Sequence, residues 1–170
     1  DSLHYGNRGS AAEIGHMPIN LDGPLCKCGR TGCLESLVSK KAIYEKFLGN
    51  QINLRYPEVD LDGIFDWLVR SADSVDFAKA CLDDIARYVG KAIANVQSLL
   101  DQDITVLHSY LCENDFFWGM LKETFDKETS FFPVSECHLT KSKLGSDVFL
   151  IGATALARRY FFKKNYLLYQ

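Results

Sequence analysis

The chain has 170 residues, of which 47% are hydrophobic and 24% are charged. This balance is typical of a globular domain and excludes a disordered, fibrous or membrane-embedded chain. Its 19 Lys and Arg residues and 22 Asp and Glu residues give a net charge of -3. Because no basic block interrupts this mixture, direct nucleic-acid binding by this chain is disfavoured.

No apolar run approaches the roughly 20 residues that cross a bilayer, so we expect no membrane contact. The amino-terminal residues also lack the charged and apolar regions of a signal peptide. We therefore expect a cytoplasmic protein. The sequence begins at Asp1 and has no initiating methionine, which leaves open that the natural protein starts upstream.

The amino-terminal segment is predicted to be rich in turns, because six of the 12 glycines fall within residues 1–33. Apolar residues then recur at helical spacing, which predicts helices over residues 34–48, 60–72 and 74–100, with a loop over residues 49–57. Gly90 interrupts the longest of these helices. A glycine there indicates close packing against another backbone or a mild defect.

Short apolar runs predict a buried strand over residues 104–108 and a second strand, cut by Pro133, over residues 131–134. Further helices are predicted over residues 116–125 and 148–162. Helices that alternate with short strands favour an α/β fold with a small sheet covered by helices. Two strands are too few for a complete sheet, so strands are expected upstream.

Four metal-ligating side chains lie close together in the amino-terminal segment: His16, Cys26, Cys28 and Cys33. A tetrahedral Cys3His zinc site needs this set, and a closed shell of four protein ligands makes the zinc structural. Gly29 and Gly32 allow the tight turn that aims the sulfur atoms of Cys28 and Cys33 inward. The alternative is a loop that carries free thiols.

Two motifs resemble a known family. The run from Gly6 through Glu13-Ile14-Gly15-His16, and the run from Cys26 to Glu35, with the pattern Cys-x-Cys-Gly-x-x-Gly-Cys-x-Glu, are similar to the signature of the ROK proteins. These are bacterial repressors, open reading frames and sugar kinases. The resemblance implies an α/β, actin-like (ribonuclease H-like) ATPase-superfamily fold. Residues 1–170 would form its helix-rich C-terminal sugar-binding lobe, with a zinc-bound loop over residues 13–35, and the N-terminal lobe and any helix-turn-helix would lie upstream.

The resemblance also implies roles for individual residues. The residue matching His16 binds zinc and contacts the sugar, and those matching Glu13 and Glu35 hydrogen-bond sugar hydroxyls. The chemistry agrees, because carboxylates accept hydrogen bonds from hydroxyls and a metal-locked loop would hold them in place. The alternatives are a solvated loop charge for Glu13 and a helix-start carboxylate for Glu35.

The family includes kinases and regulators, and one segment favours a regulator. Where the kinases have a Gly-Gly turn against the nucleotide, this chain has His108-Ser109-Tyr110. Their side chains restrict close approach of a phosphate, so nucleotide binding is expected to be impaired. The expected function is a sugar-sensing effector domain. The alternatives are the C-terminal half of an ATP-dependent sugar kinase, with ATP as cofactor only in that case, and a zinc-stabilised interaction module without a sugar ligand.

The expected partners follow from this interpretation. They are a small-molecule sugar and, only through an upstream domain, DNA. Homo-oligomers are common in the family, and an unpaired sheet edge invites pairing with a second copy.

Overall fold

The computed structural model describes residues 3–51, 58–131 and 138–166. Its helices in chain order are α1 (Leu34–Val38), α2 (Lys40–Gln51), α3 (Ile64–Ser71), α4 (Asp76–Leu100), α5 (Asp115–Thr129) and α6 (Val148–Tyr166). Its strands are β1 (Ile104–Leu107) and β2 (His138–Lys141), and its short 3-10 helices are η1 (Ile14–His16), η2 (Tyr110–Glu113) and η3 (Gly145–Asp147). The alternation of helices and strands agrees with the predicted α/β class.

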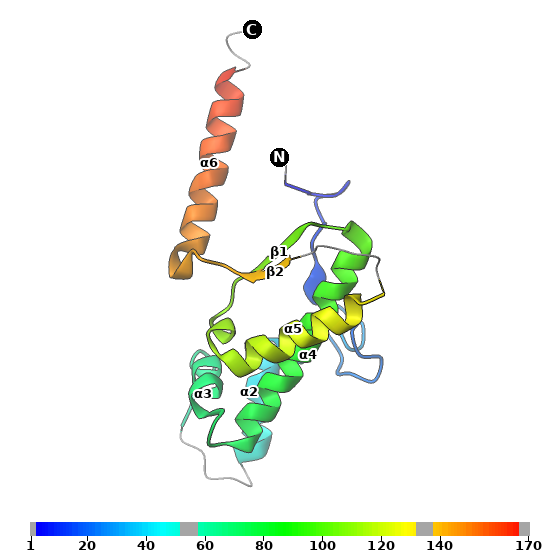
Figure 1. Cartoon of the computed structure of the whole chain (residues 1–170), viewed down its shortest axis with the longest axis vertical. Coiled ribbons are helices and arrows are strands. Elements are labelled where there is room, and N and C mark those ends of the chain that lie inside the picture. The colour runs from blue at the N-terminus through cyan, green and yellow to red at the C-terminus, as the bar shows by residue number, and fades with distance from the viewer. Residues whose placement is uncertain (1–2, 52–57, 132–137, 167–170) are drawn as a thin grey trace.

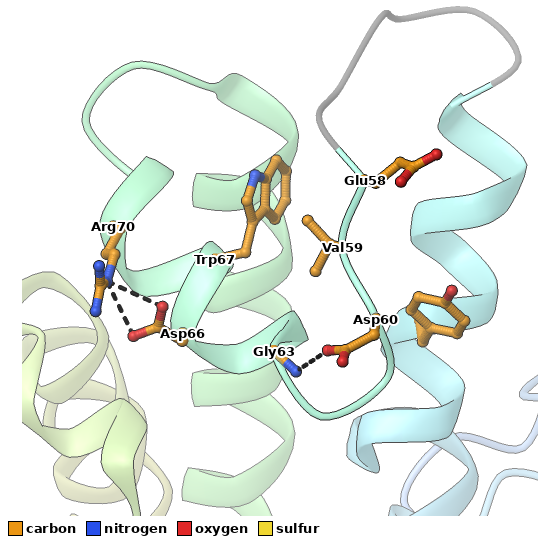
Figure 2. A pocket seen from close by; sticks show the side chains of 8 residues that line it. Glu58, Val59, Asp60, Gly63, Asp66, Trp67 and Arg70 are labelled. Carbon is orange, nitrogen blue, oxygen red and sulfur yellow. Dashed lines mark hydrogen bonds and ion pairs between the residues drawn. The ribbon is translucent and has the colours of Figure 1, made fainter.

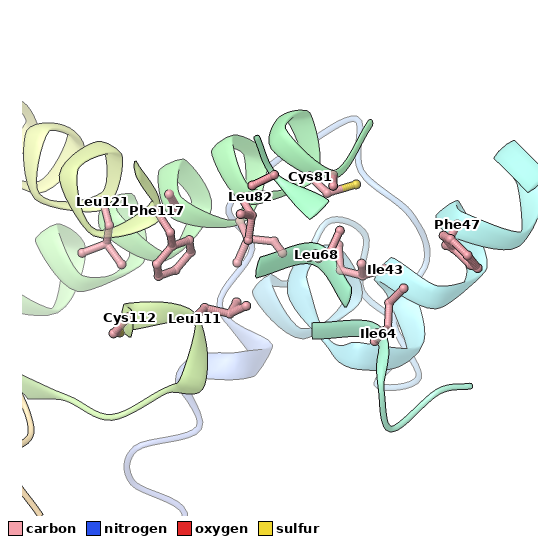
Figure 3. Close-up of a cluster of buried hydrophobic side chains, with 14 residues drawn as sticks. Ile43, Phe47, Ile64, Leu68, Cys81, Leu82, Leu111, Cys112, Phe117 and Leu121 are labelled. Atoms are coloured by element: carbon pink, nitrogen blue, oxygen red, sulfur yellow. The ribbon is translucent and has the colours of Figure 1, made fainter. Parts of the chain in front are cut away.

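Helices α4 and α5 lie side by side at the centre of the molecule, and α1 and α3 pack against α4 (Figure 1). Buried side chains of α2, α3, α4, η2 and α5 form one core (Figure 3). Phe47 of α2, Leu82 of α4 and Phe117 of α5 are among its largest members. Burial of each such side chain stabilises the fold by roughly 1.5–3 kcal/mol. These helices therefore pack with their apolar faces towards the core.

The predicted helix over residues 34–48 is divided in two at Ser39. The backbone of Ser39 is extended, with ψ 155°, so α1 ends there. The Ser39 hydroxyl then accepts a hydrogen bond from the Ala42 backbone N–H over 3.2 Å. This contact satisfies a free amide at the start of α2, which is the preferred role of serine at a helix N-terminus.

The other predicted helices are confirmed with shifted ends. Helix α5 begins after Asn114, whose side chain accepts a hydrogen bond from the Phe117 backbone N–H over 2.9 Å. At Gly90 the backbone of α4 meets α5 closely, so the close-packing interpretation of this glycine is correct.

The two strands pair in parallel, with Ile104 opposite His138 and Leu107 opposite Lys141. The predicted strand over residues 131–134 lies outside the described residues except for Phe131, which is in a turn. The prediction that the first strand is buried is wrong. Ile104 and Val106 are 55% and 57% exposed, because no layer covers their face of the sheet in the described part of the chain.

Helix α6 extends away from the rest of the chain (Figure 1). Its large apolar side chains are exposed, including Phe149, Tyr160 and Phe161. Among the described residues, no helix has the length and apolar character needed to cross a membrane.

Candidate metal centre and binding site

The structure brings the four predicted metal ligands together. The candidate ligand atoms of His16, Cys26, Cys28 and Cys33 all lie within 4.8 Å of one another. The Cys26 Sγ atom is 3.6 Å from His16 Nδ1, and the Cys28 Sγ atom is 3.6 Å from Cys33 Sγ. Ligand atoms of a tetrahedral zinc ion lie about 3.5–3.8 Å apart, given the usual Zn–S and Zn–N distances. The donor set and its spacing therefore fit zinc.

Backbone contacts shape the loop that carries the three cysteines. The Cys26 N–H donates to the Arg30 carbonyl over 2.8 Å, and the Gly29 N–H donates to the Cys26 carbonyl over 2.9 Å. Gly32 has a φ of +67°, and a Cβ atom there would overlap the Asn20 carbonyl oxygen. Only glycine fits at this position, as the tight-turn prediction requires.

The thiols in this cluster differ in environment. Burial raises the pKa of Cys33 to about 11. Hydrogen bonds from the backbone and side chain of Arg30 lower the pKa of the exposed Cys28 to about 6. Zinc binds cysteine as the thiolate, and a cation at the centre of the cluster would offset the burial of charge at Cys33.

Glu35 lies at the edge of the metal cluster, in the first turn of α1. Its Oε2 atom is 3.5 Å from His16 Nδ1, and its Oε1 atom is 2.6 Å from the Nζ atom of Lys27. The hydrogen bond from Lys27 lowers the pKa of Glu35. The structure thus places one predicted carboxylate beside the predicted imidazole and holds it ionised.

Glu13 lies three residues before His16, and its carbonyl oxygen accepts a hydrogen bond from the His16 N–H over 3.1 Å. Its side chain is exposed. No hydrogen bond joins the carboxylates of Glu13 and Glu35 to a common partner in the described residues. The residue that sequence reasoning missed is Lys27, although its position between Cys26 and Cys28 places it on the metal loop.

A second crevice lies at the carboxyl ends of β1 and β2, where parallel sheets usually bind ligands. It has a volume of about 540 Å³ and is lined by the His108-Ser109-Tyr110 segment together with Lys141 and Ser142. The Ser109 and Ser142 hydroxyls accept hydrogen bonds from nearby backbone amides over 3.2 Å. The Lys141 ammonium lies 5.1 Å from the centre of the Trp118 ring. The Ser109, Ser142 and Lys141 side chains that line the crevice therefore already have partners within the chain.

A larger cavity of about 830 Å³ lies between α2 and α3 (Figure 2). Two of its charged groups, Arg70 and Asp66, form an ion pair. The Arg70 Nε atom contacts both oxygens of Asp66, at 3.0 and 2.9 Å, and Asp60 accepts from the Gly63 N–H over 2.7 Å. None of the predicted site residues lines this cavity.

The comparison with known proteins gives the class to which this fold and site belong. The sequence model of the ROK family matches residues 1–160. The chain therefore belongs to the ROK family, as its two motifs predict.

Relatives within the family include both kinases and repressors. An N-acetylmannosamine kinase of Vibrio cholerae is 30% identical over 142 residues, which cover 80% of this chain and 45% of the kinase. The xylose repressor of Bacillus spizizenii is 24% identical over 164 residues, which cover 94% of this chain and 40% of the repressor. The chain spans about half the length of the curated relatives it matches.

A solved structure supports the predicted fold. The crystal structure of a ROK family glucokinase from Streptomyces griseus, in complex with glucose and AMPPNP, matches with a TM-score of 0.70 and 26% identity. The match covers 93% of this chain and 55% of the glucokinase. The fold is therefore that of the ROK kinases, which is the actin-like ATPase fold.

Proposed function

We propose that this chain is the sugar-binding C-terminal lobe of a ROK-family transcriptional regulator, in which a sugar acts as the effector. The observation that carries the proposal is the position of Glu35. Its carboxylate lies beside His16 on the rim of the metal cluster, so a ligand that binds there is in contact with a rigidly held acceptor.

The proposed sugar site consists of Glu13, His16 and Glu35. Carboxylates are acceptor-only groups, and each can accept hydrogen bonds from two adjacent hydroxyls of a sugar ring. Glu13 and His16 belong to the same short turn, and Glu35 lies in the first turn of the helix that follows the cysteine loop. The relative positions of the turn and the helix therefore decide whether the three side chains reach one ligand.

The proposed role of the metal is to fix those positions. His16, Cys26, Cys28 and Cys33 would hold a zinc ion, and zinc with four protein ligands supplies structural rigidity and does not activate water. Cys33 directly precedes α1, which begins at Leu34. The four ligands would therefore tie the turn that carries Glu13 to the helix that carries Glu35.

The segment after β1 supports a regulator over a kinase. Ser109 uses its hydroxyl to cap η2. The Tyr110 hydroxyl donates a hydrogen bond to Asp66 of α3 over 2.8 Å. These contacts hold side chains where a nucleotide would need open backbone, and this arrangement disfavours a bound phosphate.

A ROK sugar kinase is the second candidate, favoured by two comparisons. Relatives with 30% identity are named as kinases, and the glucokinase structure contains AMPPNP together with glucose. On that alternative ATP is the cofactor, and the segment after β1 would have to rearrange to bind it.

Titration calorimetry with a panel of sugars tests the proposal. D-glucose, D-xylose, N-acetylglucosamine and N-acetylmannosamine would be titrated into the protein and into its Glu13→Gln and Glu35→Gln variants. We expect at least one sugar to bind, and each variant to weaken it by about 10- to 150-fold, the range for hydrogen bonds to charged groups. Sugar-dependent ADP release from ATP would be measured in parallel on the full-length protein, because the chain spans about half the length of the curated relatives it matches.

The possible outcomes separate the candidates. Binding that both variants weaken, with no sugar-dependent ADP release, supports the regulator. Sugar-dependent ADP release identifies the kinase. No binding by any sugar favours a zinc-stabilised interaction module, in which Glu13 and Glu35 affect only local stability.

The regulator proposal includes partners and a location. DNA would be bound by a helix-turn-helix in another part of the protein, because residues 1–170 contain no basic block. Such a regulator acts in the cytoplasm. A second copy of the chain is the partner we propose for the exposed edge of the sheet.

A further inference from the structure

We infer that Lys27 is a ligand-binding residue of the proposed sugar site, where its ammonium group donates hydrogen bonds to the hydroxyl that Glu35 holds. This inference rests on the proposed function, because it requires a polyol at Glu35. No motif of the chain assigns a role to Lys27, which occupies the variable position of the Cys-x-Cys pair.

The geometry of the Glu35 carboxylate carries the inference. One oxygen, Oε1, is 2.6 Å from the Lys27 Nζ atom, and the other, Oε2, is 3.5 Å from His16 Nδ1. Glu35 is therefore flanked by Lys27 on one side and by the metal cluster on the other. A ligand that reaches Oε1 also comes within reach of the ammonium group.

The balance of donors and acceptors explains what Lys27 adds. A sugar hydroxyl has one hydrogen to donate and two lone pairs to accept. The carboxylates of Glu13 and Glu35 offer acceptors only, so a hydroxyl that donates to Glu35 has no partner in these two groups for its own lone pairs. Lys27 carries three N–H donors and uses one of them on Glu35. One hydroxyl can thus donate to Glu35 and accept from Lys27.

This pairing defines a class of ligand. Only a group that both donates and accepts satisfies the two side chains, so the site selects a free hydroxyl at one ring position. A deoxy sugar lacks both functions at that position. We therefore expect the Lys27–Glu35 pair to recognise one hydroxyl of a neutral monosaccharide by hydrogen bonds.

Both side chains of the pair are accessible from solvent. The backbone of Lys27 is held within the cysteine loop, while its side chain is 72% exposed and accessible to a ligand.

A purely structural role for the pair is the competing explanation. Exposed ion pairs contribute little to folding stability, because solvent screens them and the side chains lose entropy. If Lys27 serves the ligand, its removal will change sugar affinity and leave the melting temperature within about 2 °C of the original.

The test compares three lysine variants by calorimetry with a sugar from the panel that binds the wild-type protein. Lys27→Met removes the donors, Lys27→Arg keeps them, and Lys41→Met is the matched control. Lys41 is also an exposed lysine in an ion pair, but its ammonium group pairs with Glu45 of the same helix at 3.9 Å and not with Glu35. The absorption spectrum of bound Co²⁺ and the melting temperature report on whether the metal loop is intact.

We expect Lys27→Met to weaken sugar binding about 10-fold or more, as loss of a hydrogen bond from a charged donor predicts. Lys27→Arg should stay within about 3-fold and Lys41→Met should have no effect. The Co²⁺ spectrum should be the same in all three variants. A deoxy analogue that binds the wild-type protein weakly should show no further loss in Lys27→Met.

Two results overturn the inference, and they are distinguishable. If Lys27→Met binds sugar as tightly as the wild type or more tightly, while Glu35→Gln still weakens binding, the ammonium group only competes for Glu35 and the proposed function stands. If no sugar in the panel binds the wild-type protein, the proposed function and this inference fail together.

Discussion

Gly90 of α4 lies directly against the backbone of Leu121 in α5. A Cβ atom at Gly90 would be 2.8 Å from the Leu121 carbonyl oxygen and 3.0 Å from the Thr124 Cβ atom. The two central helices therefore approach each other more closely than any side chain at residue 90 would allow. The contact explains a glycine in a helix, where it otherwise costs about 1 kcal/mol relative to alanine.

We predict that Gly90→Ala destabilises the fold by about 1–3 kcal/mol, because the added methyl group pushes α4 and α5 apart. Gly119 of α5 is the matched control, since a Cβ atom there would meet nothing within 4 Å. Gly119→Ala should stabilise the helix by about 0.4–1 kcal/mol. Thermal unfolding of both variants measures the difference, and an equal shift of the same sign in the two would contradict the packing argument.

A second pair of glycines tests the metal loop. Gly29 and Gly32 both have positive φ angles, but only Gly32 has a neighbour in the way, because a Cβ atom there would overlap the Asn20 carbonyl oxygen. Gly29→Ala should cost about 1–2 kcal/mol, the penalty for a left-handed residue with a side chain. Gly32→Ala should reduce the free energy of unfolding by more than Gly29→Ala does, and it should displace the loop.

The measurement for this pair is Co²⁺ binding followed by absorption spectroscopy. We expect Gly29→Ala to bind one Co²⁺ with a tetrahedral thiolate spectrum, and Gly32→Ala to bind it far more weakly. Equal Co²⁺ affinity in the two variants would show that the Asn20 contact does not shape the site.

Removal of the metal should loosen the molecule unevenly. The four proposed ligands lie within residues 16–33, whereas α4 is held by the apolar core. A closed metal site supplies folding free energy locally, so a chelator should raise hydrogen exchange over residues 3–35 far more than over α4. A uniform rise across the chain would contradict a local structural metal.

The exposed strand β1 predicts self-association. Ile104 and Val106 present apolar side chains to solvent on one face of a two-stranded sheet, next to the proposed dimer edge, and an exposed apolar surface favours an interface. We expect a dimer in sedimentation velocity, and a shift towards monomer in Val106→Lys, which places a charge on that face. A wild-type protein that is monomeric at high concentration would refute this prediction.

The metal cluster was predictable from sequence because its chemistry is local. His16 and the three cysteines are separated by short turns, and ligand type and spacing alone define such a site. The long helix α4 was predictable for a similar reason, since one apolar face along the chain is enough to define a helix.

Features that depend on other segments were not predictable. Serine is a preferred residue at a helix N-terminus, but the apolar pattern continues through Ser39, so this pattern does not show that Ser39 ends one helix and caps the next. Strand β2 alternates weakly, since its residues are at most half-buried, and the exposure of β1 depends on what covers the sheet. The Lys27–Glu35 contact joins residues eight positions apart, and no residue pattern indicates it.

The most direct test of the central claim, that the metal cluster positions a sugar site, is a sugar titration before and after metal removal. A panel sugar that binds the wild-type protein would be titrated into the metal-loaded protein, the chelated protein, and the chelated protein with zinc restored. We predict that chelation abolishes measurable binding and that zinc restores it, because His16 and Glu35 lose their fixed relation without the ion. Unchanged sugar affinity in the chelated protein would contradict the account.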